Sequence, residues 1–140
     1  MVAKQISVFL ENRKGRLGAV LDVLKDNGVN ILSLSLADTA EYGILRIISN
    51  KAETGKKALS AAGFSCMLTD VFILQAPHTP GALQNILRVI SNEELNVEYM
   101  YGLSVAGEDA YIVVKTSNIP RAEEVFTQQG IITISETSLS

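Results

Sequence analysis

The sequence repeats itself at an interval of about 66 residues, and this duplication constrains the fold more than any other feature. The segment Gly15-Arg16-Leu17 returns as Gly81-Ala82-Leu83, 66 positions later. Further along, Gly63 returns as Gly130, so the interval has grown to 67 through one additional loop residue. A repeat this long exceeds the usual solenoid periods. It therefore predicts two copies of one compact unit.

The expected units are residues 1–70 and 71–140. The composition, 47% hydrophobic and 19% charged, is far from that of a disordered chain. A module of about 70 residues is only marginally stable alone, so two of them gain by sharing a buried face. The junction near Asp70 has no Pro/Gly/Ser-rich linker, and we expect the modules to be packed together and not tethered.

Within each copy, the spacing of apolar residues predicts the order strand, helix, strand, strand, helix, strand. The expected strands are 6–10, 31–36, 44–48 and 66–68, then 71–74, 97–103, 111–114 and 131–134. The expected helices are 17–24, 52–62, 81–91 and 119–128. This order predicts an α+β chain of two ferredoxin-like βαββαβ modules, each an antiparallel sheet with both helices on one face.

In each copy a glycine stands in the turn at the start of the first helix, at Gly15 and Gly81. The first backbone N–H groups of a helix lack intrahelical partners and carry partial positive charge, which suits a carboxylate or phosphate. Glycine would let a ligand approach without a Cβ in the way. In the second copy, Thr79 is expected to cap the helix and Pro80 to occupy its first position. A plain helix start is the alternative interpretation.

An asparagine follows each of these helices, Asn30 in the first copy and Asn96 in the second. Its side chain offers a donor and an acceptor, which suits an α-amino or α-carboxyl group. The alternative is that each asparagine only caps a turn.

These features resemble the ACT domain, the amino-acid-sensing module of enzymes such as phosphoglycerate dehydrogenase, aspartokinase and the acetohydroxyacid synthase regulatory subunit. The resemblance rests on Glu11–Leu17 followed by Gly28–Ile31, and on His78–Leu83 followed by Leu95–Val97. It spans roughly Lys4 to Ser135. Two departures from the family pattern Asn-Arg-Pro-Gly-x-Leu are Lys14, where proline is usual, and His78, where asparagine is common.

The resemblance implies a non-catalytic regulatory protein that binds a free amino acid where one module's loop faces the neighbouring module's strand. The implied ligand-binding residues are Asn12, Arg13, Lys14, Gly15, Arg16, Leu17, Gly18, Asn30 and Ile31 in the first copy, and His78, Thr79, Pro80, Gly81, Ala82, Asn96 and Val97 in the second. Because the two loops differ, we expect unequal sites. Loops filled by the protein's own side chains would argue against ligand binding.

An enzyme is the first alternative, and the sequence argues against it. His78 is the only histidine, and no G-x-S-x-G motif, P-loop or C-x-x-C pair is present. Cys66 stands among apolar neighbours, as expected of an inert strand thiol. We therefore expect no catalytic residue, no metal and no cofactor.

An RNA-recognition fold is the second alternative because it shares this order of elements. The net charge of −3 and the scattered Lys and Arg residues oppose nucleic-acid binding. Tyr99 and Tyr101 fall on one face of a strand and are better suited to an interface or a pocket wall.

The expected location is the cytoplasm, without a membrane. The N-terminus does not fit a signal peptide, and the longest apolar stretch, 71–74, is far shorter than the ~20 residues of a membrane helix. The expected partners are a free amino acid and a second copy of the chain, since each module has a sheet edge. Two roles stay open: a ligand-free assembly module, or a regulatory subunit of a separate enzyme of amino-acid metabolism.

Overall fold

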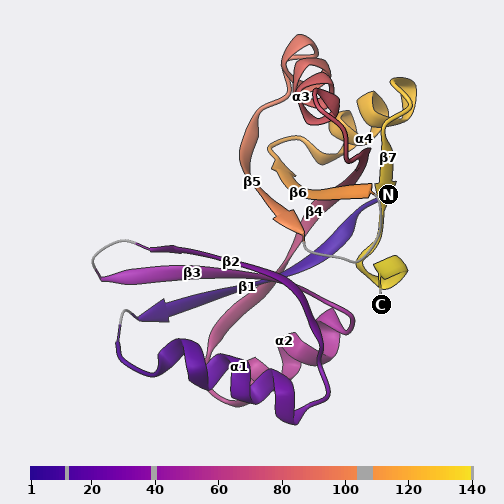
Figure 1. Cartoon of the computed structure of the whole chain (residues 1–140). Helices are drawn as coiled ribbons and strands as arrows, with labels where there is room; N and C mark the ends of the chain where they lie inside the picture. The colour runs from indigo at the N-terminus through magenta and orange to yellow at the C-terminus, as the bar shows by residue number, and fades with distance from the viewer. Residues whose placement is uncertain (12, 39–40, 104–108, 140) are drawn as a thin grey trace. The chain divides into compact units, whose positions relative to one another are not determined.

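The computed structural model describes residues 1–11, 13–38, 41–103 and 109–139 (Figure 1). Its contacts divide the chain into two compact units. The N-terminal module is built on Lys4–Thr69, and the C-terminal module on Asp70–Ser138 together with Met1–Ala3. No helix in the described segments is long and apolar enough to cross a membrane.

The N-terminal module follows the expected order of elements. They are β1 (Ala3–Glu11), α1 (Arg16–Asp26), β2 (Ile31–Asp38), β3 (Tyr42–Ser49), α2 (Ala52–Ala61) and the first part of β4 (Ser65–Pro77). Its strands lie in the order β2-β3-β1-β4, and β3 pairs antiparallel with both β2 and β1.

The C-terminal module repeats this arrangement. It comprises the rest of β4, α3 (Ala82–Asn92), β5 (Val97–Leu103), β6 (Asp109–Thr116), α4 (Ile119–Gln128) and β7 (Ile132–Ile134), followed by a 3₁₀ helix (Glu136–Leu139). β4 pairs antiparallel with β6 and with β7, and β5 pairs antiparallel with β6. The α+β fold of two ferredoxin-like modules, inferred from the repeat, is confirmed.

One expectation about the strands is wrong. The segments 66–68 and 71–74 are not separate strands but parts of the continuous strand β4. The polar pair Thr69-Asp70 does not end the strand, and both residues are half-buried within it. The Thr69 hydroxyl is satisfied by Ser7 of β1, with 2.8 Å between the two oxygens.

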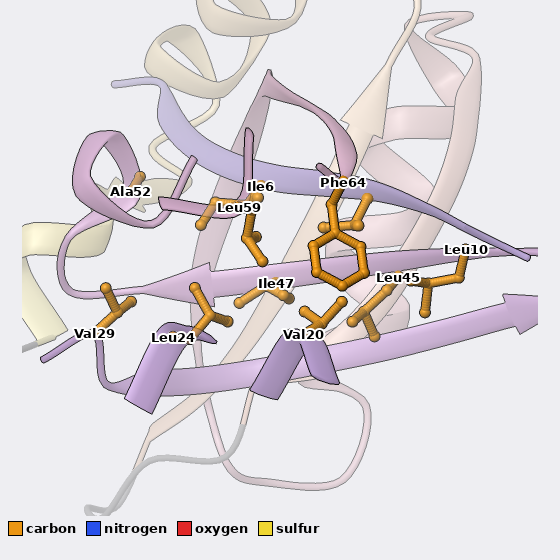
Figure 2. Close-up of a cluster of buried hydrophobic side chains, with 11 residues drawn as sticks. Ile6, Leu10, Val20, Leu24, Val29, Leu45, Ile47, Ala52, Leu59 and Phe64 are labelled. Atoms are coloured by element: carbon orange, nitrogen blue, oxygen red, sulfur yellow. The ribbon is translucent and has the colours of Figure 1, made fainter. Parts of the chain in front are cut away.

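The core of the N-terminal module lies between its sheet and its two helices (Figure 2). Alternate residues of β1, Ile6 and Val8 among them, point to the same face and are fully buried. They meet Val20 and Leu24 of α1 and Leu59 of α2. The helical spacing of Val20 and Leu24 is therefore what attaches α1 to the sheet and fixes the position of its N-terminus.

The core of the C-terminal module is built in the same way, with aromatic residues at its centre. Phe72 of β4 and Phe126 of α4 pack edge to face, with 5.0 Å between ring centroids and 82° between planes. Ile90 of α3 joins the same cluster. Both helices therefore cover the face of the sheet that carries Phe72.

Candidate functional site

Each module has a tight turn between its first strand and first helix, formed by Arg13–Arg16 and Thr79–Ala82. The Arg16 N–H donates to the Arg13 carbonyl at 3.3 Å, and the Ala82 N–H donates to the Thr79 carbonyl at 3.2 Å. Gly15 has φ 86° and ψ −7°, and Gly81 has φ 84° and ψ −9°. These values are those of the third residue of a type II turn, where glycine is favoured. The backbone conformation therefore explains both glycines.

The structure corrects the expected capping of the second helix. α3 begins at Ala82, and Gly81 is its N-cap, without a side-chain hydrogen bond. Thr79 therefore does not cap the helix, and Pro80 is not its first residue, because the left-handed Gly81 separates them from it. A Cβ on Gly81 would meet no atom of the described residues within 4 Å. The positive φ of position 81, and not a lack of room for a Cβ, is therefore what requires glycine there.

The helix N-termini that follow these turns are free of side-chain caps. Neither Gly15 nor Gly81 supplies a capping side chain, and neither α1 nor α3 carries an acidic residue in its first turn. The partial positive charge of each N-terminus is therefore not neutralised by an acid of its own first turn.

Beside the second turn, the C-terminal module contains a cavity of about 760 Å³, which we call the C-cavity. Its lining residues are Ala76, Pro77, His78, Thr79, Pro80, Leu83, Gly102, Leu103, Asp109, Ala110, Tyr111 and Ile112. This volume lies within the range of about 300–1,000 Å³ typical of small-molecule sites. The sequence-predicted residues His78, Thr79 and Pro80 form its rim and are exposed.

The strand residues that line the C-cavity come from both faces of the sheet, and four of them belong to the helix-covered face: Ala76, Gly102, Ala110 and Ile112. In the strand register Ala76 stands opposite Ala110, and Gly102 stands opposite Ile112. Residues opposite each other share a face, and Ile112 belongs to the core under the helices. Ala76, Ala110 and Gly102 are all small, so the side chains that the structure describes leave this end of the helix-covered face unfilled. Alternation places the Asp109 and Tyr111 side chains on the other face.

The matching position of the N-terminal module is nearly filled. A cavity of only about 70 Å³ lies beside the first turn, lined by Leu10, Glu11, Arg13, Arg16, Leu17, Leu36 and Gly43.

Two substitutions between the copies account for this difference. The repeat places Leu10 at the position of Ala76, and their partners in the register, Gly43 and Ala110, also correspond. It places Leu36, opposite Leu45, at the position of Gly102. Two leucine side chains of the N-terminal module are thus replaced by a methyl group and a hydrogen in the C-terminal module.

Arg16 fills further space in the N-terminal module. Its guanidinium carbon lies 4.4 Å from the centroid of the Phe64 ring, and its Nε is buried without a hydrogen-bond partner. The repeat places Ala82 at this position, and a second cavity of about 390 Å³ lies beside Ala82. That cavity shares four lining residues with the C-cavity: Ala76, Pro77, Thr79 and Pro80. The first loop thus shows the self-filling that argues against a ligand, whereas the second does not.

The two asparagines lie away from the turns of their own modules. Asn30 follows the end of α1 that is remote from Gly15, and the 11 residues of α1 extend for about 16 Å. The Asn30 N–H donates to Asn50 Oδ1 at 2.8 Å. In the second copy, Asn96 Nδ2 donates to Ser117 Oγ at 2.8 Å. The two contacts join residues 20 and 21 positions apart, and the first uses the backbone of Asn30, so neither is the local side-chain bond of the turn-capping alternative.

The remaining sequence-predicted residues divide among several places. Arg13, Arg16 and Leu17 line the small N-terminal cavity, while Lys14, Gly15 and Gly18 are exposed. Asn30 and Ile31 line a separate hollow of about 410 Å³ at the C-terminal end of α1. Val97 packs against the C-terminal core. Asn12 lies outside the described residues.

Sequence reasoning missed the small residues Ala76, Gly102 and Ala110. They carry no polar group and so give no signal for a ligand. The signal that could have revealed Ala76 and Gly102 is the pairing of the copies, in which each stands where the other copy has leucine.

The groups that would suggest an enzyme are dispersed. Within the described segments, no three His, Cys, Asp or Glu side chains are grouped so as to hold a metal ion. Cys66 is half-buried, and its thiol donates to the Lys56 carbonyl at 3.5 Å. His78 is exposed at the rim of the C-cavity.

Comparison with known proteins gives a family and a fold. A family model described as an ACT domain pair matches residues 1–140. A crystal structure of a Bacteroides thetaiotaomicron protein is 37% identical, with a TM-score of 0.92, covering 99% of this chain and 96% of that one. The regulatory subunit of aspartate kinase from Thermus thermophilus has a TM-score of 0.61 at 14% identity, over 91% and 95% of the two chains. Its counterpart from Thermus flavus has a TM-score of 0.58, also at 14% identity and with the same coverage. No protein of curated function matches the sequence significantly.

Proposed function

Because the chain belongs to the ACT domain pair family, we propose that it is a regulatory protein that binds a free amino acid and performs no chemistry on it. The observation that supports this most is the C-cavity, which adjoins an uncapped helix N-terminus. An amino acid has two parts that match it. Its carboxylate suits the N-terminus of α3, and its side chain suits the cavity below the turn.

The two predicted halves of each site require two modules. Within one module the asparagine and the glycine turn lie at opposite ends of a helix, so a site that uses both must take the asparagine from a neighbouring module. We propose that Asn30, Ile31, Asn96 and Val97 serve as this second half, across a homodimer. The edge strand β2 supports a homodimer, because its Leu34 is 44% exposed.

A thermal-shift screen of the twenty amino acids against the full chain tests the proposal. An amino acid at a hundred times its Kd should stabilise the native state by about 2.7 kcal/mol. Isothermal titration then compares the best amino acid with the corresponding amine, which lacks the carboxylate. We expect the amine to bind far more weakly.

The same screen separates the alternatives. If no amino acid shifts the unfolding transition, the proposed function is wrong, and a ligand-free assembly module becomes the better interpretation. Sedimentation velocity with and without the bound amino acid measures whether the assembly state carries the signal. If the amine binds as tightly as the amino acid, the proposed contact between the ligand's carboxylate and the α3 N-terminus is wrong.

A further inference from the structure

We propose that the C-terminal module alone holds the ligand's side chain and that it selects an amino acid with a bulky apolar side chain. This inference rests on the proposed function, and it adds which module is used and which ligand class is taken. The N-terminal module has the same fold, but its own side chains already occupy the matching space.

Among the residues that the structure describes, the two copies are a filled and an open version of one site. In the N-terminal module, Leu10 and Leu36 project from the strands into the space beside the glycine turn. In the C-terminal module their counterparts are Ala76 and Gly102, and the C-cavity occupies that space. The side chains that fill the first copy therefore indicate what fits the second: a bulky apolar group.

The walls of the C-cavity agree with this choice. Its helix-covered side is lined by Leu83 from α3 and by Ile112 from β6, together with the small residues Ala76 and Ala110. Burying a charged or strongly polar side chain against these groups would be unfavourable without a hydrogen-bonding partner. The polar rim, with Thr79 among its residues, lies at the turn, where the ligand's main-chain groups would be.

Arg16 gives an additional reason for the asymmetry. Its guanidinium covers the Phe64 ring in the N-terminal module. The residues at these two positions in the C-terminal module, Ala82 and Ile131, line a second cavity that adjoins the C-cavity. The available space therefore extends from the sheet end toward α3. It accommodates aromatic as well as branched aliphatic side chains.

Two substitutions that restore the N-terminal pattern test the inference. Gly102→Leu and Ala76→Leu place leucine where the first copy has it. Gly102 has an ordinary φ, and a Cβ there meets no atom within 4 Å, so the fold should tolerate the larger side chain. Met100→Leu is the matched control, because it places leucine two residues earlier on the same face of β5. Circular dichroism and urea unfolding check that all three variants fold.

Titration calorimetry with leucine, valine, phenylalanine, serine, aspartate and lysine gives the readout. We expect an apolar amino acid to bind tightest, with one site per chain, and each methylene of its side chain to change affinity by roughly tenfold or more. Binding should weaken by about tenfold or more in Gly102→Leu and Ala76→Leu and stay unchanged in Met100→Leu.

The outcomes distinguish this inference from the proposed function. Tightest binding of serine, aspartate or lysine, two equal sites per chain, or full affinity in folded Gly102→Leu would overturn the inference and leave amino-acid binding intact. Failure of all twenty amino acids to bind would overturn the proposed function and this inference with it.

Discussion

Replacing Gly81 by alanine should destabilise the protein, whereas replacing Gly102 by alanine should not. Both glycines line or adjoin the C-cavity, and at either position an added Cβ meets no atom within 4 Å in the part of the chain that the structure describes. They differ in backbone conformation, because Gly81 has φ 84° and Gly102 has an ordinary φ. The pair therefore separates the effect of φ from the effect of space.

The expected magnitude follows from two opposing terms. A residue with a Cβ in the left-handed region costs roughly 1–2 kcal/mol. Removing the glycine's freedom in the unfolded chain returns about 0.4–1 kcal/mol. Gly81→Ala should therefore lower the free energy of unfolding by about 1 kcal/mol. Gly102→Ala should raise it by up to about 0.5–1 kcal/mol, because glycine is unfavourable within a strand.

Urea unfolding followed by circular dichroism measures both changes. With a slope of about 1–3 kcal/mol per molar, a loss of about 1 kcal/mol lowers the midpoint by roughly 0.3–1 M. Gly81→Asn should lose less than Gly81→Ala, since asparagine tolerates the left-handed region. If Gly81→Ala matches the wild type, or if asparagine is no better than alanine, the type II turn is not what requires this glycine.

Substitutions at Glu94 and at Phe126, each with a control, also test the fold. Glu94 is a non-glycine residue at positive φ, 57°, where the first copy has Gly28 at 70°. Glu94→Gly should therefore raise the free energy of unfolding by about 0.5–1 kcal/mol in urea melts, while Glu94→Ala, which keeps the strained φ, should give no gain. Phe126 is 1% exposed and packs on Phe72, so Phe126→Ala should lower the free energy of unfolding by about 3–5 kcal/mol. Phe9→Ala, at a side chain 57% exposed, should change stability by no more than about 0.5 kcal/mol, and a similar loss in both would refute the described core.

Much of the fold could be predicted from the sequence because its signals are local. The spacing of Val20 and Leu24 predicts the buried face of α1, and the alternation of Ile6, Val8 and Leu10 predicts a strand with one buried side. The duplication then assigns the same arrangement to the second half. The error at Thr69 and Asp70 arose because a polar pair can break a strand or lie within one, and only its neighbours decide which.

The candidate site depends on relations that the order of residues does not contain. The sequence alone located the glycine turns, since Gly15 and Gly81 each precede a helical pattern. Only the tertiary structure placed Ala76 and Gly102 in the lining of one cavity. The two residues belong to β4 and β5, and the pairing of both strands with β6 sets their relative position. Whether a site is open or filled is a matter of volume, and volume depends on side chains that converge from distant parts of the chain. The same turn therefore stands beside a nearly filled space in one copy and beside a cavity in the other.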